Sequence, residues 1–338
     1  MIIIFPPTID WGWMTQRPQQ IMKQFALDGH NVYFCNRTQK KGKIITDISP
    51  NLHLVNNNQA FIRQFIPRLK KHGQIIVWVT WPRLHPYLDQ YFPDFIVYDF
   101  VDDFPEWSVD VPYMVKKSNL VLTTSQMIQQ HMEQYYPRKR SYFIPNGCDF
   151  EHFQQFNESP PEKPEEYKEH QGPIIGYVGA WAPWIDEDLI KEIANAFPQA
   201  MISLIGAEFR RKYNLSLPNA IFHGHKPYES LPQYLYYCDV CLIPFKINRT
   251  TLATNPIKMY EYLAAGKPVV STDLPEVRNV PYVYIGKDST SFIQKIEILL
   301  AKEIDLNQQE LNDWLYSHSW KKRYQDIKQI LRENRILK

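Results

Sequence analysis

The segment 255–270 combines a predicted helix start with two charged side chains that could bind a phosphorylated ligand. Free N–H groups at a helix start attract phosphate, and Lys258 would add a positive charge there. Glu261 follows three residues later on the same helix face and could accept hydrogen bonds from both hydroxyls of a ribose. This spacing suits a nucleoside diphosphate, and the alternative is a surface ion pair between Lys258 and Glu261. The predicted helix start consists of Asn255, Pro256 and Ile257.

Two neighbouring carboxylates, Asp102 and Asp103, follow an apolar run at 95–99 that ends in Asp99. Carboxylates this close can raise each other's pKa, so that one of them can act as a general base. The alternatives are capping of the following helix by one of the two, or metal binding, which lacks a recognisable set of further ligands. We predict a general base at Asp102 or Asp103.

A long aromatic loop, residues 6–18, follows the first apolar run. It lacks the G-x-G-x-x-G spacing of a dinucleotide-binding turn. Its side chains Asp10, Trp11 and Arg17 are candidates for contact with an acceptor or with the cleft around it. The alternative is a loop held in place only by its own two Trp residues.

Two further loops follow apolar runs in the second half of the chain. Gly179 could let a sugar or phosphate approach the backbone, and Trp184 lies nearby in sequence. The segment 223–228 contains His225, Lys226 and Tyr228, and its backbone could read the edge of a nucleobase. A zinc site at the two His residues of this segment would need ligands that the sequence does not supply.

Short apolar runs alternate with helical patterns along the whole chain, which predicts buried parallel strands connected by helices. The fold class is therefore α/β, with two doubly wound parallel-sheet domains. The predicted division is a domain at 1–153, a Pro-rich and acidic linker at 154–172, a domain at 173–318 and a terminal helix at 319–338. The predicted strands are 2–5, 32–35, 75–79, 95–99, 119–123, 142–144, 174–178, 201–205, 220–223, 239–244, 268–271 and 282–285. The predicted helices are 18–28, 126–134, 187–196, 256–265 and 289–302, besides the terminal one.

Composition and charge limit the classes of function. Only 12 of the 338 residues are Gly and 26 are Pro, which excludes a flexible low-complexity chain. Residues 1–150 hold 16 Lys and Arg against 12 Asp and Glu, and residues 319–338 hold seven against two. A basic first domain and tail favour an anionic partner, such as a membrane surface or an acidic glycan. Scattered aromatic residues and an acidic second domain argue against nucleic acid.

The first residues carry no basic region, and their apolar run breaks at Pro6 and Pro7, so we expect no signal peptide. No apolar run reaches the roughly 20 residues of a membrane-spanning helix. We expect a cytoplasmic protein, peripheral at the inner face of the plasma membrane. The mixed apolar and basic segment 61–72 is a candidate for that contact through the first domain.

Five ordered segments together resemble the GT-B fold glycosyltransferases that build bacterial polysaccharides. The resemblance is to the glycosyltransferases of teichuronic acid synthesis and, more distantly, to the xanthan glucuronosyltransferase. It implies two Rossmann-like domains facing across a cleft, with the acceptor on the first, a UDP-sugar donor on the second and the last helix packed back on the first. It also implies that Lys258 contacts the diphosphate and Glu261 the ribose, while Gly179 and the loop from His225 to Tyr228 border the donor. The segments are 97–103, 120–125, 144–153, 176–180 and 255–270.

The chain departs from this family at one position. Many retaining members carry two Glu eight positions apart, and the first would fall at Ala253. We therefore expect an inverting transfer of a hexosyl or glucuronosyl group to a hydroxyl of a cell-surface glycan or lipid-linked acceptor. No cofactor and no metal are expected. The alternatives are a UDP-sugar 2-epimerase and a non-catalytic, two-lobed sugar-binding protein.

Overall fold

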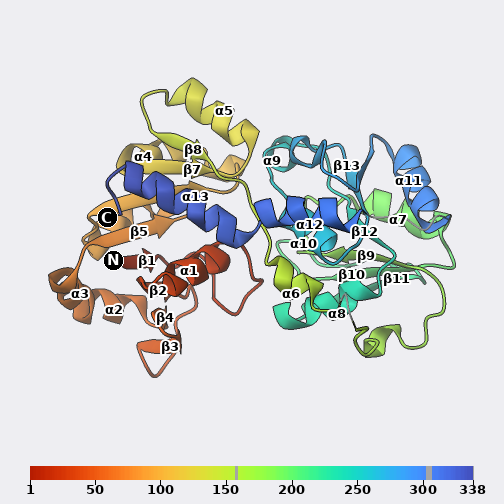
Figure 1. Cartoon of the computed structure of the whole chain (residues 1–338), viewed down its shortest axis with the longest axis horizontal. Helices are drawn as coiled ribbons and strands as arrows, with labels where there is room; N and C mark the ends of the chain where they lie inside the picture. The colour runs from red at the N-terminus through yellow and green to blue at the C-terminus, as the bar shows by residue number, and fades with distance from the viewer. Residues whose placement is uncertain (157–158, 302–306, 338) are drawn as a thin grey trace. The chain divides into compact units, whose positions relative to one another are not determined.

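The computed structural model describes residues 1–156, 159–301 and 307–337, and it divides into two compact units (Figure 1). The first unit comprises Met1–Asn146 and Trp320–Lys338, and the second comprises Gly147–Ser319. The predicted linker at 154–172 lies inside the second unit, where Tyr167 is fully buried. Of that linker, residues 157–158 fall outside the described part of the chain.

The first unit contains an eight-stranded sheet in the order β3-β4-β2-β1-β5-β6-β7-β8. All neighbouring strands are parallel except β3 and β4, which pair antiparallel. Its strands are β1 (Ile2–Phe5), β2 (Asn31–Cys35), β3 (Ile45–Ser49), β4 (Leu52–Val55), β5 (Ile75–Val79), β6 (Phe95–Phe100), β7 (Leu120–Thr123) and β8 (Ser141–Phe143). Its helices are α1 (Arg17–Leu27), α2 (Asn58–Gln64), α3 (Ile66–His72), α4 (Val111–Lys117), α5 (Gln126–Tyr135) and α13 (Trp320–Glu333), with short 3-10 helices η1 (Pro82–Tyr91) and η2 (Pro105–Trp107).

The second unit contains a six-stranded parallel sheet in the order β11-β10-β9-β12-β13-β14. Its strands are β9 (Ile174–Val178), β10 (Met201–Ile205), β11 (Ala220–Gly224), β12 (Val240–Ile243), β13 (Val269–Thr272) and β14 (Val283–Gly286). Its helices are α6 (Phe150–Gln154), α7 (Glu187–Ala196), α8 (Leu231–Tyr236), α9 (Arg249–Leu252), α10 (Ile257–Ala264), α11 (Ser289–Ala301) and α12 (Gln308–Ser317), with 3-10 helices η3 (Glu165–Tyr167), η4 (Tyr228–Ser230) and η5 (Pro275–Val277).

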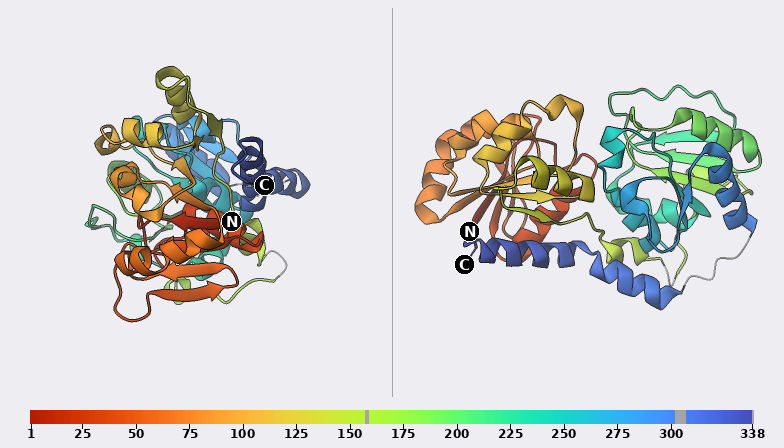
Figure 2. Two further views of the ribbon diagram at one scale, coloured as in Figure 1. Left: turned by 90° about the vertical axis from the view of Figure 1, so that its left-hand side faces the viewer. Right: turned by 90° about the horizontal axis from the view of Figure 1, so that it is seen from above.

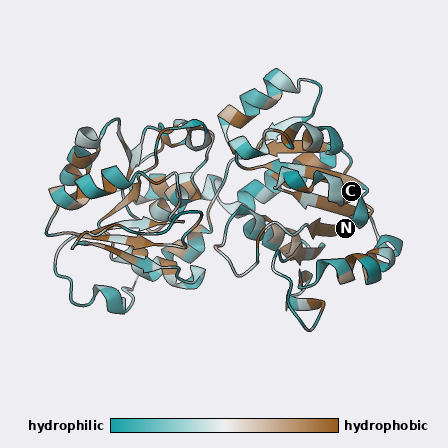
Figure 3. Cartoon of the chain, turned by 180° about the vertical axis from the view of Figure 1, so that it is seen from behind, coloured by the Kyte–Doolittle hydropathy of each residue, from teal (hydrophilic) through white to brown (hydrophobic). Residues whose placement is uncertain are grey.

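The central strands of both sheets are continuous apolar runs, as expected of parallel strands that helices cover on both faces. Every residue of β1, β5, β9 and β10 is buried. Figure 3 shows the strands of each unit as hydrophobic and the outer sides of the helices as mainly hydrophilic. The two α/β parallel-sheet domains expected from the sequence are therefore confirmed.

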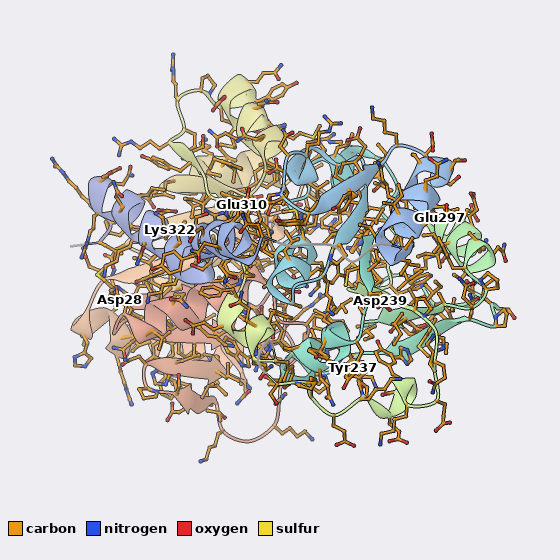
Figure 4. The ribbon with its side chains drawn as sticks, turned by 45° about the vertical axis from the view of Figure 1, so that its right-hand side comes forward. Asp28, Tyr237, Asp239, Glu297, Glu310 and Lys322 are labelled. Atoms are coloured by element: carbon orange, nitrogen blue, oxygen red, sulfur yellow. The ribbon has the colours of Figure 1, made fainter. Side chains whose placement is uncertain are left out.

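Helix α13 packs along α1 in the first unit, as the views of Figure 2 show. The Tyr324 hydroxyl donates to the Asp28 carboxylate at 2.7 Å, and the Tyr324 ring meets Phe25 edge-on at 4.9 Å between centroids. Lys328 adds an ion pair to Asp28, the residue labelled at the end of α1 in Figure 4. The apolar face of α13 and Asp28 thus fix the last helix to the first.

No helix in the described part of the chain combines the length and hydropathy that crossing a bilayer requires.

Candidate active site

Lys258, which is half-buried, and the buried Glu261 form an ion pair on α10 in the second unit. The Lys258 Nζ lies 2.7 Å from Glu261 Oε2, and the two side chains are 17% and 3% exposed. The i,i+3 pair considered as the alternative from the sequence does form, but it lies inside the protein. A cation and a buried carboxylate one helical turn apart can hold an anionic group and a hydroxyl-rich group side by side.

The start of α10 leaves backbone donors open. Pro256 occupies the N-cap position, and within the described residues no side chain caps this helix. The N–H groups of Ile257 and Lys258 therefore keep their hydrogen-bonding capacity for a ligand. Asn255 is buried and donates to Glu276 Oε2 at 3.1 Å, while its own Oδ1 accepts from the Tyr260 hydroxyl. These bonds fix the loop that leads into the helix.

Burial raises the pKa of Glu261, and the nearby Lys258 opposes that effect. His152 on α6 also favours the carboxylate form of Glu261 through its electrostatic interaction. The His152 ring stacks on Tyr228 at 4.5 Å between centroids, and its Nε2 lies 3.1 Å from the Tyr228 carbonyl oxygen. Because a carbonyl only accepts, Nε2 must carry a proton. His152 lies about 100 residues before α10, so spacing along the chain does not predict its interaction with Glu261.

Three glycines bring the carboxyl ends of β9, β10 and β11 together. The Gly179 N–H donates to the Ile205 carbonyl at 2.8 Å, and the Gly206 N–H donates to the Gly224 carbonyl at 2.9 Å. Gly206 has a φ of +155°, and a Cβ there would lie 1.8 Å from the Gly179 oxygen. These turns therefore pack backbone against backbone and keep side chains away from the strand ends.

The other predicted residues of the second unit lie in two loops. Lys226 forms an ion pair with Glu166. His225, the residue before it, is exposed to solvent. Trp184 is half-buried against Phe209, and its carbonyl accepts from the Lys246 N–H at 2.8 Å. Lys226 thus has a structural partner, and its contact with a donor stays a prediction, as do those of His225 and Trp184.

Asp102 and Asp103 follow β6 in the first unit, and both side chains are partly buried. Burial, and to a lesser extent the Asp103 charge, raises the pKa of Asp102 to about 6. The buried Tyr98 hydroxyl has no hydrogen-bond partner among the described residues, and both carboxylates interact with it electrostatically. A carboxylate with this pKa can take a proton from a hydroxyl nucleophile near neutral pH.

Arg17 is only 2% exposed, and its side chain bonds to several groups of the first unit. Its Nε lies 3.0 and 2.8 Å from the two carboxylate oxygens of Asp99, which also accepts from the Trp78 indole. Its Nη1 donates to the carbonyls of Ile144 and Pro145. Arg17 therefore holds α1 to β6 and to the end of β8, and its contact with an acceptor stays a prediction.

Asp10 and Trp11 are also engaged within the first unit. Burial opposes ionisation of Asp10, but hydrogen bonds from the Thr38 hydroxyl and N–H outweigh it and lower its pKa. The Trp11 ring meets Phe34 edge-on at 5.1 Å. A carboxylate with a lowered pKa is a poor general base, so Asp102 is the better candidate.

The described residues contain no group of three or more His, Cys, Asp or Glu side chains arranged to hold a metal ion.

Residues 172–302 match the family Glycosyl transferases group 1. The chain is also 30% identical over 184 residues to a protein of Bacillus subtilis (strain 168) whose name assigns it to teichuronic acid biosynthesis as the glycosyltransferase TuaH. That alignment covers 52% of this chain and 46% of the relative, so the chain spans about half the length of the curated relative it matches.

Solved structures share the fold over nearly the whole chain. Sucrose-phosphate synthase from Thermosynechococcus elongatus aligns with a TM-score of 0.68 at 16% identity and covers 98% of both chains. Anabaena HepE in complex with UDP and glucose aligns with a TM-score of 0.65 at 13% identity and covers 98% of both chains. The UDP-forming trehalose-phosphate synthase from Burkholderia xenovorans gives 0.68 at 10% identity, covering 98% of this chain and 99% of its own.

The family match lies on the unit that contains Lys258 and Glu261, and the structural matches extend over both units. The resemblance inferred from the five sequence segments is therefore confirmed. Residues 172–302 match the glycosyl transferases group 1 family, within a chain that has the GT-B fold.

Proposed function

We propose that the chain is a glycosyltransferase that moves a sugar from a UDP-sugar to a hydroxyl group of a cell-surface glycan or lipid-linked acceptor. The observation that carries this proposal is the pair of Lys258 with the buried Glu261 beside the open start of α10. The group 1 match over residues 172–302 supports the reaction class. HepE, solved with UDP and glucose, and a trehalose-phosphate synthase described as UDP-forming support the choice of uridine.

The donor is held by residues of the second unit. The diphosphate accepts from the N–H groups at the start of α10 and from Lys258, which has further N–H donors besides the one directed at Glu261. Glu261 accepts hydrogen bonds from the ribose hydroxyls through its carboxylate. The backbone around Gly179 gives the donor a close approach, and the loop from His225 to Tyr228 contacts the nucleobase.

The reaction needs a base for the acceptor and stabilisation for the leaving group. The acceptor oxygen forms a bond to the anomeric carbon, the bond from that carbon to the UDP oxygen breaks, and Asp102 takes the hydroxyl proton. UDP leaves with the electron pair, and Lys258 and the α10 N-terminus stabilise its charge without a metal. We propose inversion at the anomeric carbon, because Ala253 supplies no second carboxylate.

The acceptor class follows from charge and from the curated relative. The first 150 residues and the last 20 are both basic, which suits an anionic glycan or a lipid-linked acceptor. The name of the B. subtilis relative places that protein in teichuronic acid biosynthesis.

The test is a screen for UDP release across UDP-sugars with glycan acceptors, followed by donor binding to two variants. Lys258→Ala should weaken UDP binding about 10- to 150-fold, since a hydrogen bond to a charged group contributes about 1.5–3 kcal/mol. The control is Lys191→Ala, which removes another i,i+3 pair, with Asp188, on the surface of α7. Equal UDP affinity in both variants would refute the phosphate site.

The screen also separates the alternative functions. A UDP-sugar 2-epimerase would convert the donor without any acceptor, and a sugar-binding protein would bind the donor without releasing UDP. NMR of the product's anomeric configuration tests inversion, and a product that keeps the donor's configuration would exclude it.

A further inference from the structure

The sequence from residue 48 to residue 88 contains no Asp or Glu, although it contains five Lys and Arg. Four of these five lie on the helices α2 and α3. Lys and Glu or Asp normally alternate on the surfaces of soluble domains. A one-sign stretch of this length produces a positive potential on one part of the surface.

The basic side chains of α2 and α3 point to solvent. Both helices are anchored by apolar residues, with Phe61 and Ile66 fully buried. The four basic side chains are exposed, and one of them, Lys70, also forms an ion pair with Asp94 at 2.6 Å. They are Arg63, Arg68, Lys70 and Lys71.

An aromatic side chain stands beside these helices in an unusual backbone conformation. Phe92 is 59% exposed and has φ +47° and ψ +52°, the left-handed region. A bulky residue other than Gly pays about 1–2 kcal/mol to adopt it. The Phe92 N–H donates to the Asp89 carbonyl at the end of η1, but side-chain packing repays little of this cost, because 59% of the residue is exposed. A strained position that presents an apolar ring outward suggests a role in contact with another body.

The neighbours of Phe92 fix it to the basic helices. On one side, the Tyr91 hydroxyl donates to Asn58 Oδ1 at 2.8 Å at the start of α2. On the other side, Asp94 pairs with Lys70 on α3 and accepts from the Ile75 N–H at 2.8 Å. Phe92 is therefore flanked in sequence by Tyr91, which contacts α2, and Asp94, which contacts α3.

We propose that Arg63, Arg68, Lys70, Lys71 and Phe92 form a basic–aromatic edge that binds the surface of an anionic lipid bilayer. The cations attract acidic headgroups, and the Phe92 ring enters the interface between headgroups and acyl chains. A soluble acidic glycan would use the charges but would offer no apolar layer to the ring. Of the acidic groups close to Phe92 in sequence, Asp94 pairs with Lys70 and Asp89 pairs with Lys117, each at 2.6 Å.

The test is co-sedimentation of the full chain with vesicles of phosphatidylcholine alone and of phosphatidylcholine and phosphatidylglycerol in equal parts. We expect binding only to the anionic vesicles at low ionic strength. Arg68→Gln with Lys71→Gln should weaken it about 25-fold, because each cation near an anionic surface contributes about fivefold. This loss should shrink as salt screens the charges.

Phe92→Asn should also weaken vesicle binding, by about tenfold, and this loss should persist at high salt because it is apolar in origin. Asn adopts the left-handed region more readily than Phe, so the fold should be kept. Two controls should bind as the unchanged protein does. Ile298→Gln removes an exposed apolar side chain from α11, and Lys191→Gln with Lys287→Gln removes two exposed charges from the second unit.

Equal binding to both kinds of vesicle, or unchanged binding of the edge variants, would overturn the proposal. So would binding to a soluble acidic polysaccharide that depends on Arg68 and Lys71 but not on Phe92, with no vesicle binding. The proposal is independent of the catalytic one: UDP release with a water-soluble acceptor should be the same in all edge variants.

Discussion

The acid limb of the pH–rate profile should belong to Asp102. Burial, with Asp103 as the second cause, raises the pKa of Asp102 from 3.8 to about 6. A general base must be ionised to accept a proton, so kcat/KM should rise with pH and level off above about pH 6. Asp102→Asn should lower kcat about 10²- to 10⁴-fold, the usual contribution of a positioned base.

Asp103→Asn provides the sharper test, because it changes the pKa of Asp102 without removing the base. Loss of the Asp103 charge should move the acid limb to lower pH. The midpoint should stay above 3.8, since burial is the larger of the two causes. The assay is initial-rate UDP release across pH under kcat/KM conditions, which reports pKa values of the free enzyme.

Asp102 should also have a measurable effect on the stability of the folded protein. The pKa of Asp102 is raised in the folded protein, so its ionisation costs stability as pH rises through about 6 and costs nothing below 3.8. Asp102→Asn should therefore increase the free energy of unfolding at neutral pH by up to about 3 kcal/mol. The measured gain should be smaller than this limit, because the side chain is only partly buried. A variant that is no more stable, or that keeps full turnover, would refute the assignment of Asp102.

Three further variants test the packing and the donor site. Glu261→Gln should weaken UDP binding about tenfold or more by calorimetry, since a charged acceptor for the ribose is lost; an unchanged affinity would contradict this role. Arg17→Leu should lower the free energy of unfolding in urea by about 3–5 kcal/mol, because it leaves the buried Asp99 charge without its cation; an unchanged midpoint would show that the pair contributes little. Gly206→Ala should lower the thermal midpoint, as its Cβ would lie 1.8 Å from the Gly179 oxygen; a normal midpoint would mean that the turn can relax.

The sequence located the buried strands well, because a parallel strand covered on both faces is a continuous apolar run. The observed β1, β5, β9 and β10 have the predicted bounds. The β3–β4 hairpin was missed, since four of the five β3 residues are exposed and Thr46 and Asp47 interrupt any apolar pattern. Strands at a sheet edge carry a weaker signal than those in its centre.

In the candidate site, too, contacts between residues close in sequence could be predicted, and contacts between distant residues could not. Lys258 and Glu261 are three residues apart on one helix, so their contact follows from helical geometry. The partner of Arg17 is Asp99, 82 residues away, and spacing along the chain gave no sign of this contact. The contact between His152 and Tyr228, 76 residues apart, was missed for the same reason.

The second unit interrupts the first in the chain, and this order has a consequence for folding during synthesis. Residues 1–146 are translated before the second unit, but α13 follows only after residue 319. Until then Phe25 and Asp28 lack their partner Tyr324, and the α1 surface that α13 later covers stays open to water. The first unit to emerge from the ribosome is therefore the last to be completed, and while the second unit is being made this apolar surface of α1 is a target for chaperones and proteases.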